Sequence, residues 1–258
     1  ILLPIFLIGT YYTSSYLFTE HDYLIDWSWP TITIFITWAI SAFLRFMEEY
    51  RLRQEIKKQF EHYLAPVMVK KLQKNPTLLK LGGDTKELTL LFCDIRGFTP
   101  ISEQFKSDPQ GLTKLINRFL TPMTDIIMRN GGTIDKYMGD CIMAFWNAPL
   151  DVDKQRYWAI QSAHEMLEHL EGLNENSLPI KVGIGLNTGE VVVGNMGSDQ
   201  RFDYSCLGDA VNLAARLEGQ SKNYGVEIIL GEETAVNMEK DFAMLELDKI
   251  AVKGKEEA

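Results

Sequence analysis

Apolar residues fill most of the first 46 positions in two runs, each close to the length that crosses a bilayer. The first run covers residue 1 to about residue 18 and the second about 30 to 46, whereas a spanning helix needs about 20 residues. The acidic turn between them, residues 20–29, has no Lys or Arg, and Arg45 is followed by four more basic residues through Lys58. The positive-inside rule therefore predicts two transmembrane helices within residues 1–47, with everything after Arg45 in the cytoplasm.

A soluble helical hairpin is the alternative interpretation, because residues 10–16 are rich in Thr, Ser and Tyr. Residues 48–72 contain helix formers with apolar residues at helical spacing, and we expect a signalling helix that pairs with its copy. Asn75-Pro76 and Gly82-Gly83 mark a linker. The chain thus divides into a membrane segment over 1–47, a helix and linker over 48–80, and a folded domain over 81–258.

Short apolar runs alternate with helical patterns from Leu81 onward. The predicted strands and helices are, in order, strand 88–93, helix 112–128, strands 134–138 and 141–146, helix 153–170, strands 181–186, 191–193 and 201–207, helix 209–221, strand 226–230 and helix 232–238. Residues 187–190, Asn-Thr-Gly-Glu, predict a hairpin turn. The alternation predicts an α/β fold, an α+β sandwich with helices on one face of a mixed sheet.

The composition of the chain limits the classes of molecule that it is expected to bind. The chain has 35 Asp and Glu against 26 Lys and Arg, a formal charge of −9, and no basic, aromatic-studded face of the kind that binds nucleic acid. A small anionic substrate stays compatible, because local cations and metal ions override net charge. Cys93, Cys141 and Cys206 lie far apart in or beside apolar runs, and we expect buried free thiols.

Two carboxylates adjoin predicted buried strands. Asp94 follows the strand 88–93, and Asp140 lies in the turn between two short strands. A buried charge needs compensation, and Mg²⁺ binds one or two carboxylates together with substrate phosphate oxygens. Gly97 leaves room for a phosphate, and the backbone N–H groups after Asp94 can cradle it. Solvated turn acids are equally compatible with these two positions taken alone.

A second cluster lies on the predicted helix 209–221. Asn212 and Arg216 are four residues apart and project from one face. An Arg can bind a phosphate with two parallel hydrogen bonds and an Asn can hydrogen-bond a ribose, although a solvated helix face is the alternative. Lys253 and Lys255, near the C-terminus, resemble a basic tail when taken alone.

Four segments together resemble the signature motifs of class III nucleotidyl cyclases, in that family's order and spacing. They are Leu-Phe-Cys-Asp-Ile-Arg-Gly-Phe-Thr at 91–99, Gly-Gly-Thr-Ile-Asp-Lys-Tyr-Met-Gly-Asp at 131–140, Gly-Ile-Gly-Leu-Asn-Thr-Gly-Glu-Val-Val-Val-Gly-Asn-Met-Gly-Ser at 183–198, and Leu-Gly-Asp-Ala-Val-Asn-Leu-Ala-Ala-Arg-Leu-Glu at 207–218. The resemblance covers residues 81–255. Upstream, the apolar runs and residues 60–69 are similar to bacterial receptor cyclases with a CHASE-type sensor.

The resemblance implies a ferredoxin-like βαββαβ core that works as a head-to-tail homodimer with two sites at the interface. Asp94, Asp140 and the backbone carbonyl of Ile95 of one subunit would hold two Mg²⁺ or Mn²⁺ ions. Residues 97–99, which are Gly97, Phe98 and Thr99, would lie against the triphosphate.

The resemblance assigns the remaining roles to the partner copy. Asn212 would orient the ribose, and Arg216 would stabilise charge on the reacting phosphate. Lys253 would bind the terminal phosphates, with Lys255 as the alternative for that role.

The base that is bound follows from two positions. Lys136 stands where adenylate cyclases have Lys and guanylate cyclases have Glu, and an ammonium donates to adenine N1 but not to guanine N1–H. Ser205 stands where the class IIIb subgroup has Thr or Ser, and it also implies stimulation by bicarbonate. The implied reaction converts ATP to 3′,5′-cyclic AMP and pyrophosphate.

Two alternatives remain beside an adenylate cyclase. One is a guanylate cyclase on the same scaffold, against which Lys136 argues. The other is a catalytically silent dimerisation or nucleotide-sensing module. Such modules usually lose a metal-binding Asp or the Asn and Arg pair, whereas this chain retains all four.

Overall fold

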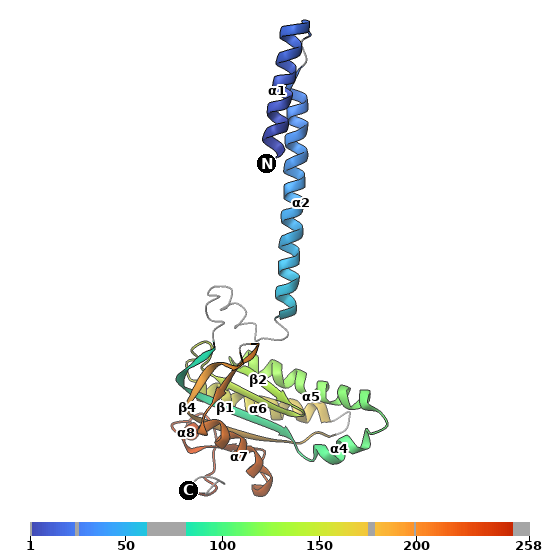
Figure 1. The fold of residues 1–258 in the computed structure, drawn as a ribbon. Helices are drawn as coiled ribbons and strands as arrows, with labels where there is room; N and C mark the ends of the chain where they lie inside the picture. The colour runs from blue at the N-terminus through green and yellow to red at the C-terminus, as the bar shows by residue number, and fades with distance from the viewer. Residues whose placement is uncertain (1, 24–25, 61–80, 175–178, 199, 250–258) are drawn as a thin grey trace. The chain divides into compact units, whose positions relative to one another are not determined.

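The chain forms two compact units, residues 1–69 and residues 70–258 (Figure 1). The computed structural model describes residues 2–23, 26–60, 81–174, 179–198 and 200–249. The second half of the predicted signalling helix, most of the linker, and both Lys253 and Lys255 lie outside these ranges.

The first unit is a helical hairpin of α1 (Leu2–His21) and α2 (Ser28–Phe60). The hydroxyl oxygens of Thr10 and Thr31 lie 3.2 Å apart across it, and the rings of Tyr11 and Trp27 meet edge to face at 5.6 Å. Within α2 the Thr37 hydroxyl donates to the Thr33 carbonyl at 2.8 Å. Such back-bonding satisfies a polar side chain inside an apolar helix.

Only α2, among the helices that the structure describes, is long and apolar enough to cross a membrane. Its candidate span is Ser28–Leu52, 25 residues, and by this measure the prediction of two spanning helices is supported for one. Hydroxyl-bearing residues at positions 10–16 lower the hydropathy of α1. The predicted boundary between residues 47 and 48 falls inside α2, which continues without a break to Phe60.

The second unit is built on a six-stranded sheet in the order β2-β3-β1-β4-β5, with β6 paired to β4. The strands are β1 (Gly82–Ile95), β2 (Thr133–Met138), β3 (Cys141–Trp146), β4 (Val182–Ser198), β5 (Arg201–Leu207) and β6 (Ile228–Leu230). The pair β4 and β6 is parallel and the other pairs are antiparallel. The central order and its two helical crossovers match the predicted βαββαβ core.

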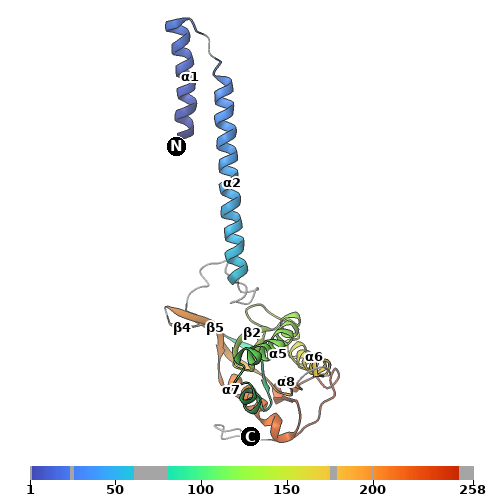
Figure 2. The same cartoon turned by 90° about the vertical axis from the view of Figure 1, so that its right-hand side faces the viewer.

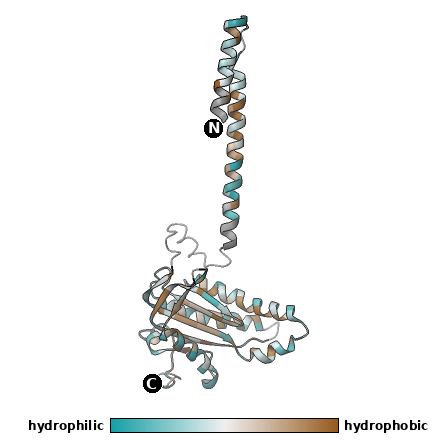
Figure 3. Cartoon of the chain, in the orientation of Figure 1, coloured by the Kyte–Doolittle hydropathy of each residue, from teal (hydrophilic) through white to brown (hydrophobic). Residues whose placement is uncertain are grey.

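Helices cover both faces of this sheet, whereas the sequence predicted helices on one. They are α4 (Phe98–Gln104), α5 (Pro109–Arg129), α6 (Gln155–Asn174), α7 (Asp209–Tyr224) and α8 (Glu232–Ala235). Leu91 and Cys93 point into the core beneath α5 and α6, which lie side by side in Figure 2, and Leu90 and Phe92 point into a second core that includes Ala214 of α7. The run Leu88–Cys93 of β1, apolar except for Thr89 and mostly brown in Figure 3, is buried at every position, which is the pattern of a strand covered on both faces.

The hairpin turn predicted at residues 187–190 is wrong, because β4 runs straight through them. All four residues pair with residues 87–90 of β1. The Asn187 amide donates to the Ala210 carbonyl at 3.1 Å, and the Thr188 hydroxyl lies 3.0 Å from that of Thr234. Tertiary partners satisfy these polar side chains, so the local turn preference is overridden.

α7 packs so closely on β4 that Gly185 has no room for a side chain. A Cβ there would overlap the backbone nitrogen of Glu218 and the carbonyl oxygen of Ala214. We expect Gly185→Ala to lower the free energy of unfolding by about 3 kcal/mol, measured by chemical denaturation. Gly219→Ala is the matched control, because a Cβ at Gly219 meets nothing within 4 Å and Ala favours the helix. Equal effects of the two variants would contradict this packing.

Candidate active site

Asp94 and Asp140 meet where β1 ends and β3 begins. Cys93 of β1 pairs with Ile142 of β3, so Asp94, just after Cys93, and Asp140, two residues before Ile142, lie at one corner of the sheet. The carboxyl groups of Asp94 and Asp140 are close neighbours, and both contact the backbone N–H of Ile95. The turn that presents Asp140 depends on Gly139, whose φ of 71° is left-handed and favours glycine.

This corner carries uncompensated negative charge. Burial, with the neighbouring Asp94 carboxyl as the next cause, raises the pKa of Asp140 to about 6. Burial and then Asp94 also raise the pKa of Glu218 on α7 to about 7, while Arg96 lowers it. Sequence reasoning missed Glu218, although it closes the fourth motif. Each of two neighbouring carboxyl groups makes ionisation of the other less favourable. A bound cation would offset this repulsion, so the pair is a candidate cation site.

The donor set is small and made of hard oxygen atoms. No group of three or more His, Cys, Asp or Glu side chains in the described ranges is arranged to hold a metal ion. Asp94 and Asp140 would therefore need the Ile95 carbonyl and substrate oxygens to complete the coordination of Mg²⁺, an ion that tolerates such a shared shell. The residues present fit that ion.

The burial of Asp140 beside Asp94 predicts a gain in stability when Asp140 is neutralised. A raised pKa means that ionised Asp140 destabilises the fold as pH rises from its ordinary value of 3.8 through about 6. We expect Asp140→Asn, in the presence of a chelator at pH 7, to raise the free energy of unfolding by about 1 kcal/mol, discounted for partial exposure. The gain should fade toward about pH 4, and a gain that persists there would contradict the assignment.

The loop after Asp94 turns at Gly97, which has φ 68° and precedes α4. Thr99 is exposed there, whereas the partly buried Phe98 packs against the main core. Arg96, inside the first motif, is structural: its backbone N–H donates to the Lys181 carbonyl at 2.7 Å and its guanidinium to the Val226 carbonyl.

Lys136 and Ser205 come together through a residue that sequence reasoning missed. β2 and β5 lie at opposite ends of the sheet order, yet they come side by side (Figure 2). The Ser205 hydroxyl donates to Asp135 Oδ2 at 2.7 Å, and Lys136 Nζ lies 3.2 Å from Asp135 Oδ1. The only signal for Asp135 was an acidic residue next to Lys136 in the second motif.

Asn212 and Arg216 lie one turn apart on α7. Asn212 is exposed and Arg216 is half-buried. The Nη1 atom of Arg216 is buried and finds no hydrogen-bond partner among the described residues. Among the described residues, neither side chain forms a hydrogen bond or ion pair with Asp94 or Asp140. A single copy therefore does not join the two halves of the predicted site.

Comparison with known families decides the identity of this unit. Residues 83–258 match the profile described as "Adenylate and Guanylate cyclase catalytic domain". The chain belongs to this cyclase family. Class III cyclase domains act on nucleotides, generally use divalent metal ions and generally dimerise, and the paired carboxylates fit the metal requirement.

Relatives of this cyclase domain include both adenylate and guanylate cyclases. The adenylate cyclase of Anabaena cylindrica is 38% identical over 189 residues, 69% of this chain but 36% of its own length. The structure of the adenylyl cyclase CyaB from P. aeruginosa aligns with a TM-score of 0.62 and 36% identity over 68% of this chain and 92% of that one. The guanylyl cyclase Cya2 aligns at 0.54 and 33% over 68% and 89%. The chain thus spans about a third of the curated relative, and the relatives alone do not set its substrate.

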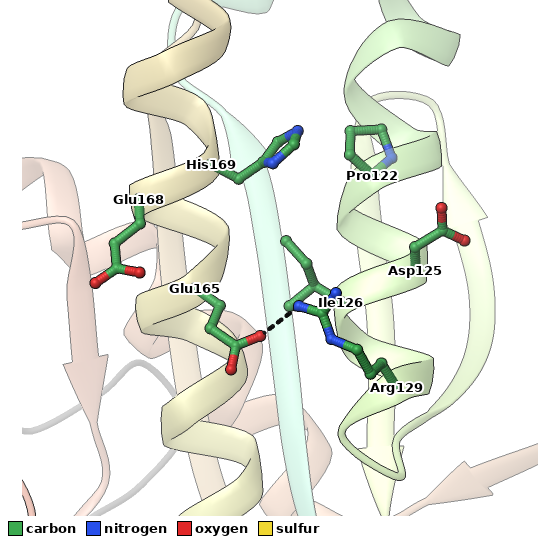
Figure 4. Close-up of a pocket in the computed structure, with 7 residues that line it drawn as sticks. All are labelled: Pro122, Asp125, Ile126, Arg129, Glu165, Glu168 and His169. Atoms are coloured by element: carbon green, nitrogen blue, oxygen red, sulfur yellow. Dashed lines mark hydrogen bonds and ion pairs between the residues drawn. The ribbon is translucent and has the colours of Figure 1, made fainter.

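A separate groove in the cyclase domain lies between α5 and α6 (Figure 4). Its volume is about 350 Å³, and its lining residues are Pro122, Asp125, Ile126, Arg129, Glu165, Glu168 and His169. Arg129 and Glu165 form an ion pair at 2.7 Å. None of the predicted site residues lines this groove, and its mixed charges make it a useful place for control substitutions.

Proposed function

We propose that this chain is an adenylate cyclase, which converts ATP to 3′,5′-cyclic AMP and pyrophosphate at sites shared between two head-to-tail copies. The observation that carries the proposal is the convergence of Asp94 and Asp140. Both are acids of the family's signature motifs, and burial together with the neighbouring Asp94 carboxyl raises the pKa of Asp140 to about 6. Such a pair is suited to gripping cations against a triphosphate.

The metal half of the site consists of Asp94, Asp140 and the Ile95 carbonyl. Two Mg²⁺ or Mn²⁺ ions held there would favour ionisation of the ribose 3′-hydroxyl and neutralise charge on the departing pyrophosphate. The backbone that follows, at Gly97 and Phe98, would lie against the triphosphate. Gly97 has no Cβ, so its left-handed turn leaves room for a phosphate at that position.

The partner copy would complete the site with α7. Asn212, exposed, would orient the ribose. Arg216 would bind the α-phosphate, and its buried Nη1 without a hydrogen bond among the described residues is a donor suited to a phosphate oxygen. Lys253, or Lys255, would bind the terminal phosphates.

The choice of ATP rests on Lys136 and Ser205. The half-exposed Lys136 ammonium is a donor that suits adenine N1, and the Ser205 hydroxyl oxygen can accept from the adenine amino group. The likeness to the guanylyl cyclase Cya2 keeps GTP as the second candidate. A silent nucleotide-sensing module is disfavoured because the acid pair and the Asn and Arg pair are all retained.

The N-terminal unit would tether the domain to a bacterial inner membrane. The candidate span Ser28–Leu52 passes directly into the rest of α2. Basic residues that follow the apolar run, among them Arg45 and Arg51, favour a cytoplasmic position for the cyclase domain. α2 would then carry signals to the dimer as one continuous helix.

The test is turnover by the purified full-length chain with ATP or GTP and Mg²⁺ or Mn²⁺. We expect cyclic AMP as the main product and a preference for ATP in kcat/KM. Cyclic GMP as the main product would favour the guanylate cyclase. No cyclic nucleotide from either substrate would leave the silent module.

A further inference from the structure

Asp135 is the extra residue of a β-bulge between β2 and β3. Pairing advances from Ile134 to Lys136 on β2 while it moves one residue, from Ala144 to Met143, on β3. In a regular strand successive side chains point to opposite faces, whereas a bulge re-aims them and is common beside active sites. Here the bulge brings the Asp135 carboxylate within 3.2 Å of the Lys136 ammonium.

The Asp135 side chain has no exposed surface at all. Its Oδ2 accepts from the Ser205 hydroxyl at 2.7 Å, and the Cys206 thiol lies at 4.0 Å. Its Oδ1 has no hydrogen bond of acceptable geometry among the described residues, although Lys136 Nζ lies at ion-pair distance. A carboxylate so placed is expensive to bury, and Lys136 is the cation at hand to compensate it.

Cys206 does not compete with Ser205 for this role. Burial, with the Asp135 charge as the next cause, raises the pKa of Cys206 to about 12. The thiol therefore keeps its proton at neutral pH and offers Asp135 at most a weak donor. The Ser205 hydroxyl remains the main donor to the carboxylate.

A hydroxyl has one proton to donate and two lone pairs that accept. An unconstrained serine can therefore face either the amino group of adenine or the O6 oxygen of guanine. When the proton of Ser205 is directed into Asp135, only lone pairs remain to face a base. Together with the Lys136 ammonium, which only donates, this gives one donor and one acceptor, complementary to N1 and the 6-amino group of adenine.

We propose that Asp135 is the positioning residue for base selection, which turns Ser205 into an obligate acceptor and holds Lys136 beside it. The inference rests on the proposed nucleotide site. It adds the residue that fixes the direction of the Ser205 hydroxyl, which could otherwise either donate to a base or accept from it. Asp135 itself would not touch the nucleotide.

The test compares kcat/KM for ATP and GTP in the parent and in Asp135→Asn. The carboxamide has donor hydrogens that a carboxylate lacks, so the Ser205 hydroxyl can turn its proton toward the base. We expect the ATP-to-GTP ratio to fall about tenfold, the size of one hydrogen bond gained and lost. The change should fall mainly on KM, because base contacts persist from the bound substrate to the transition state.

Three comparisons separate this role from a merely structural one. Purine ribonucleoside triphosphate lacks the 6-amino group, so Asp135→Asn should change its kcat/KM much less than that of ATP. Asp135→Asn should add little to Ser205→Ala, because the two act through one hydroxyl. Ser205→Thr, which keeps the hydroxyl, should keep the preference. Glu165→Gln is the matched control, since this carboxylate pairs with Arg129 in the groove between α5 and α6, and it should leave the ratio unchanged.

The inference is overturned if Asp135→Asn lowers turnover of ATP, GTP and the purine nucleotide by one common factor. It is also overturned if Ser205→Ala leaves the ATP-to-GTP ratio intact, a result that does not depend on the stability of the Asp135 variant. An inactive parent would sink the proposed function instead, and the affinities for non-hydrolysable ATP and GTP analogues, measured on the same variants, would then test Asp135 separately.

Discussion

Replacing Asp94 or Asp140 by Ala is expected to slow cyclic nucleotide formation by about 10²- to 10⁴-fold, the several kcal/mol that metal ions contribute to such reactions. The two carboxyl groups are close neighbours beside the Ile95 backbone N–H, so they form one site and not two independent ones. The double variant should therefore be little worse than either single variant, because residues that act as a unit are strongly non-additive.

The measurement is the rate of product formation with saturating ATP over a range of Mg²⁺ and Mn²⁺ concentrations. Asp125→Ala, an exposed acid on α5, is the control and should keep the parent rate. Asp140→Asn should lose activity while the metal-free protein becomes more stable, which separates catalytic loss from misfolding. A full rate in Asp94→Ala or in Asp140→Ala would remove the metal assignment.

Lys136→Glu is expected to shift the ATP-to-GTP ratio by about 10²-fold or more toward GTP. A carboxylate at this position accepts from guanine N1–H and repels adenine N1. The substitution therefore removes a hydrogen bond to adenine and adds one to guanine. The measured quantity is kcat/KM for both nucleotides. Lys114→Glu, at an exposed position on α5, carries the same charge change away from the site.

The buried neighbour of Lys136 adds a second expectation to this variant. Glu at 136 would stand beside the Asp135 carboxylate, which lies 3.2 Å from the present ammonium, and like charges at that range disfavour ionisation. The double variant Asp135→Asn with Lys136→Glu should therefore use GTP better than Lys136→Glu alone. An unchanged ATP preference in both variants would show that neither position reads the base.

The periodicity of the sequence was enough for most of the sheet. The run Cys141–Trp146 forms β3 with the predicted ends, because an apolar run bounded by Gly139-Asp140 and by polar residues has few alternatives. Residues 187–190 show where local preference fails. Their turn composition is overridden by the tertiary partners Ala210 and Thr234, which no local pattern reveals.

The residues of the candidate site differed in how well the sequence alone could predict them. Asp94 and Asp140 could be proposed together because signature motifs name them and an antiparallel neighbour strand brings their positions to one corner. The role of Asp135 could not be predicted in this way. A β-bulge changes the direction in which the side chain points, and simple alternation along a strand does not anticipate it. Glu218 was equally hidden, because its effect depends on how closely α7 packs on Gly183 and Gly185.

The prediction of two membrane-spanning helices is supported for α2 alone among the described helices. α1 is long enough to span a bilayer. Its hydroxyl-bearing residues lower its mean hydropathy, however, and it is not among the described helices that are apolar enough to cross a membrane. The continuity of α2 from Ser28 to Phe60 was not anticipated, because a change of composition at residue 48 suggested a boundary where the backbone has none. Lys253 stays a prediction, since it lies outside the described residues.

The most direct test of the shared site is complementation between two inactive chains. Asp94→Ala retains Arg216, and Arg216→Ala retains Asp94, so a mixed head-to-tail dimer contains one complete site and one doubly defective site. With random pairing, equimolar mixing should restore about a quarter of the parent activity, while each variant alone stays near background. No recovery in a mixture shown to contain mixed dimers would contradict a catalytic site built from two copies of this chain.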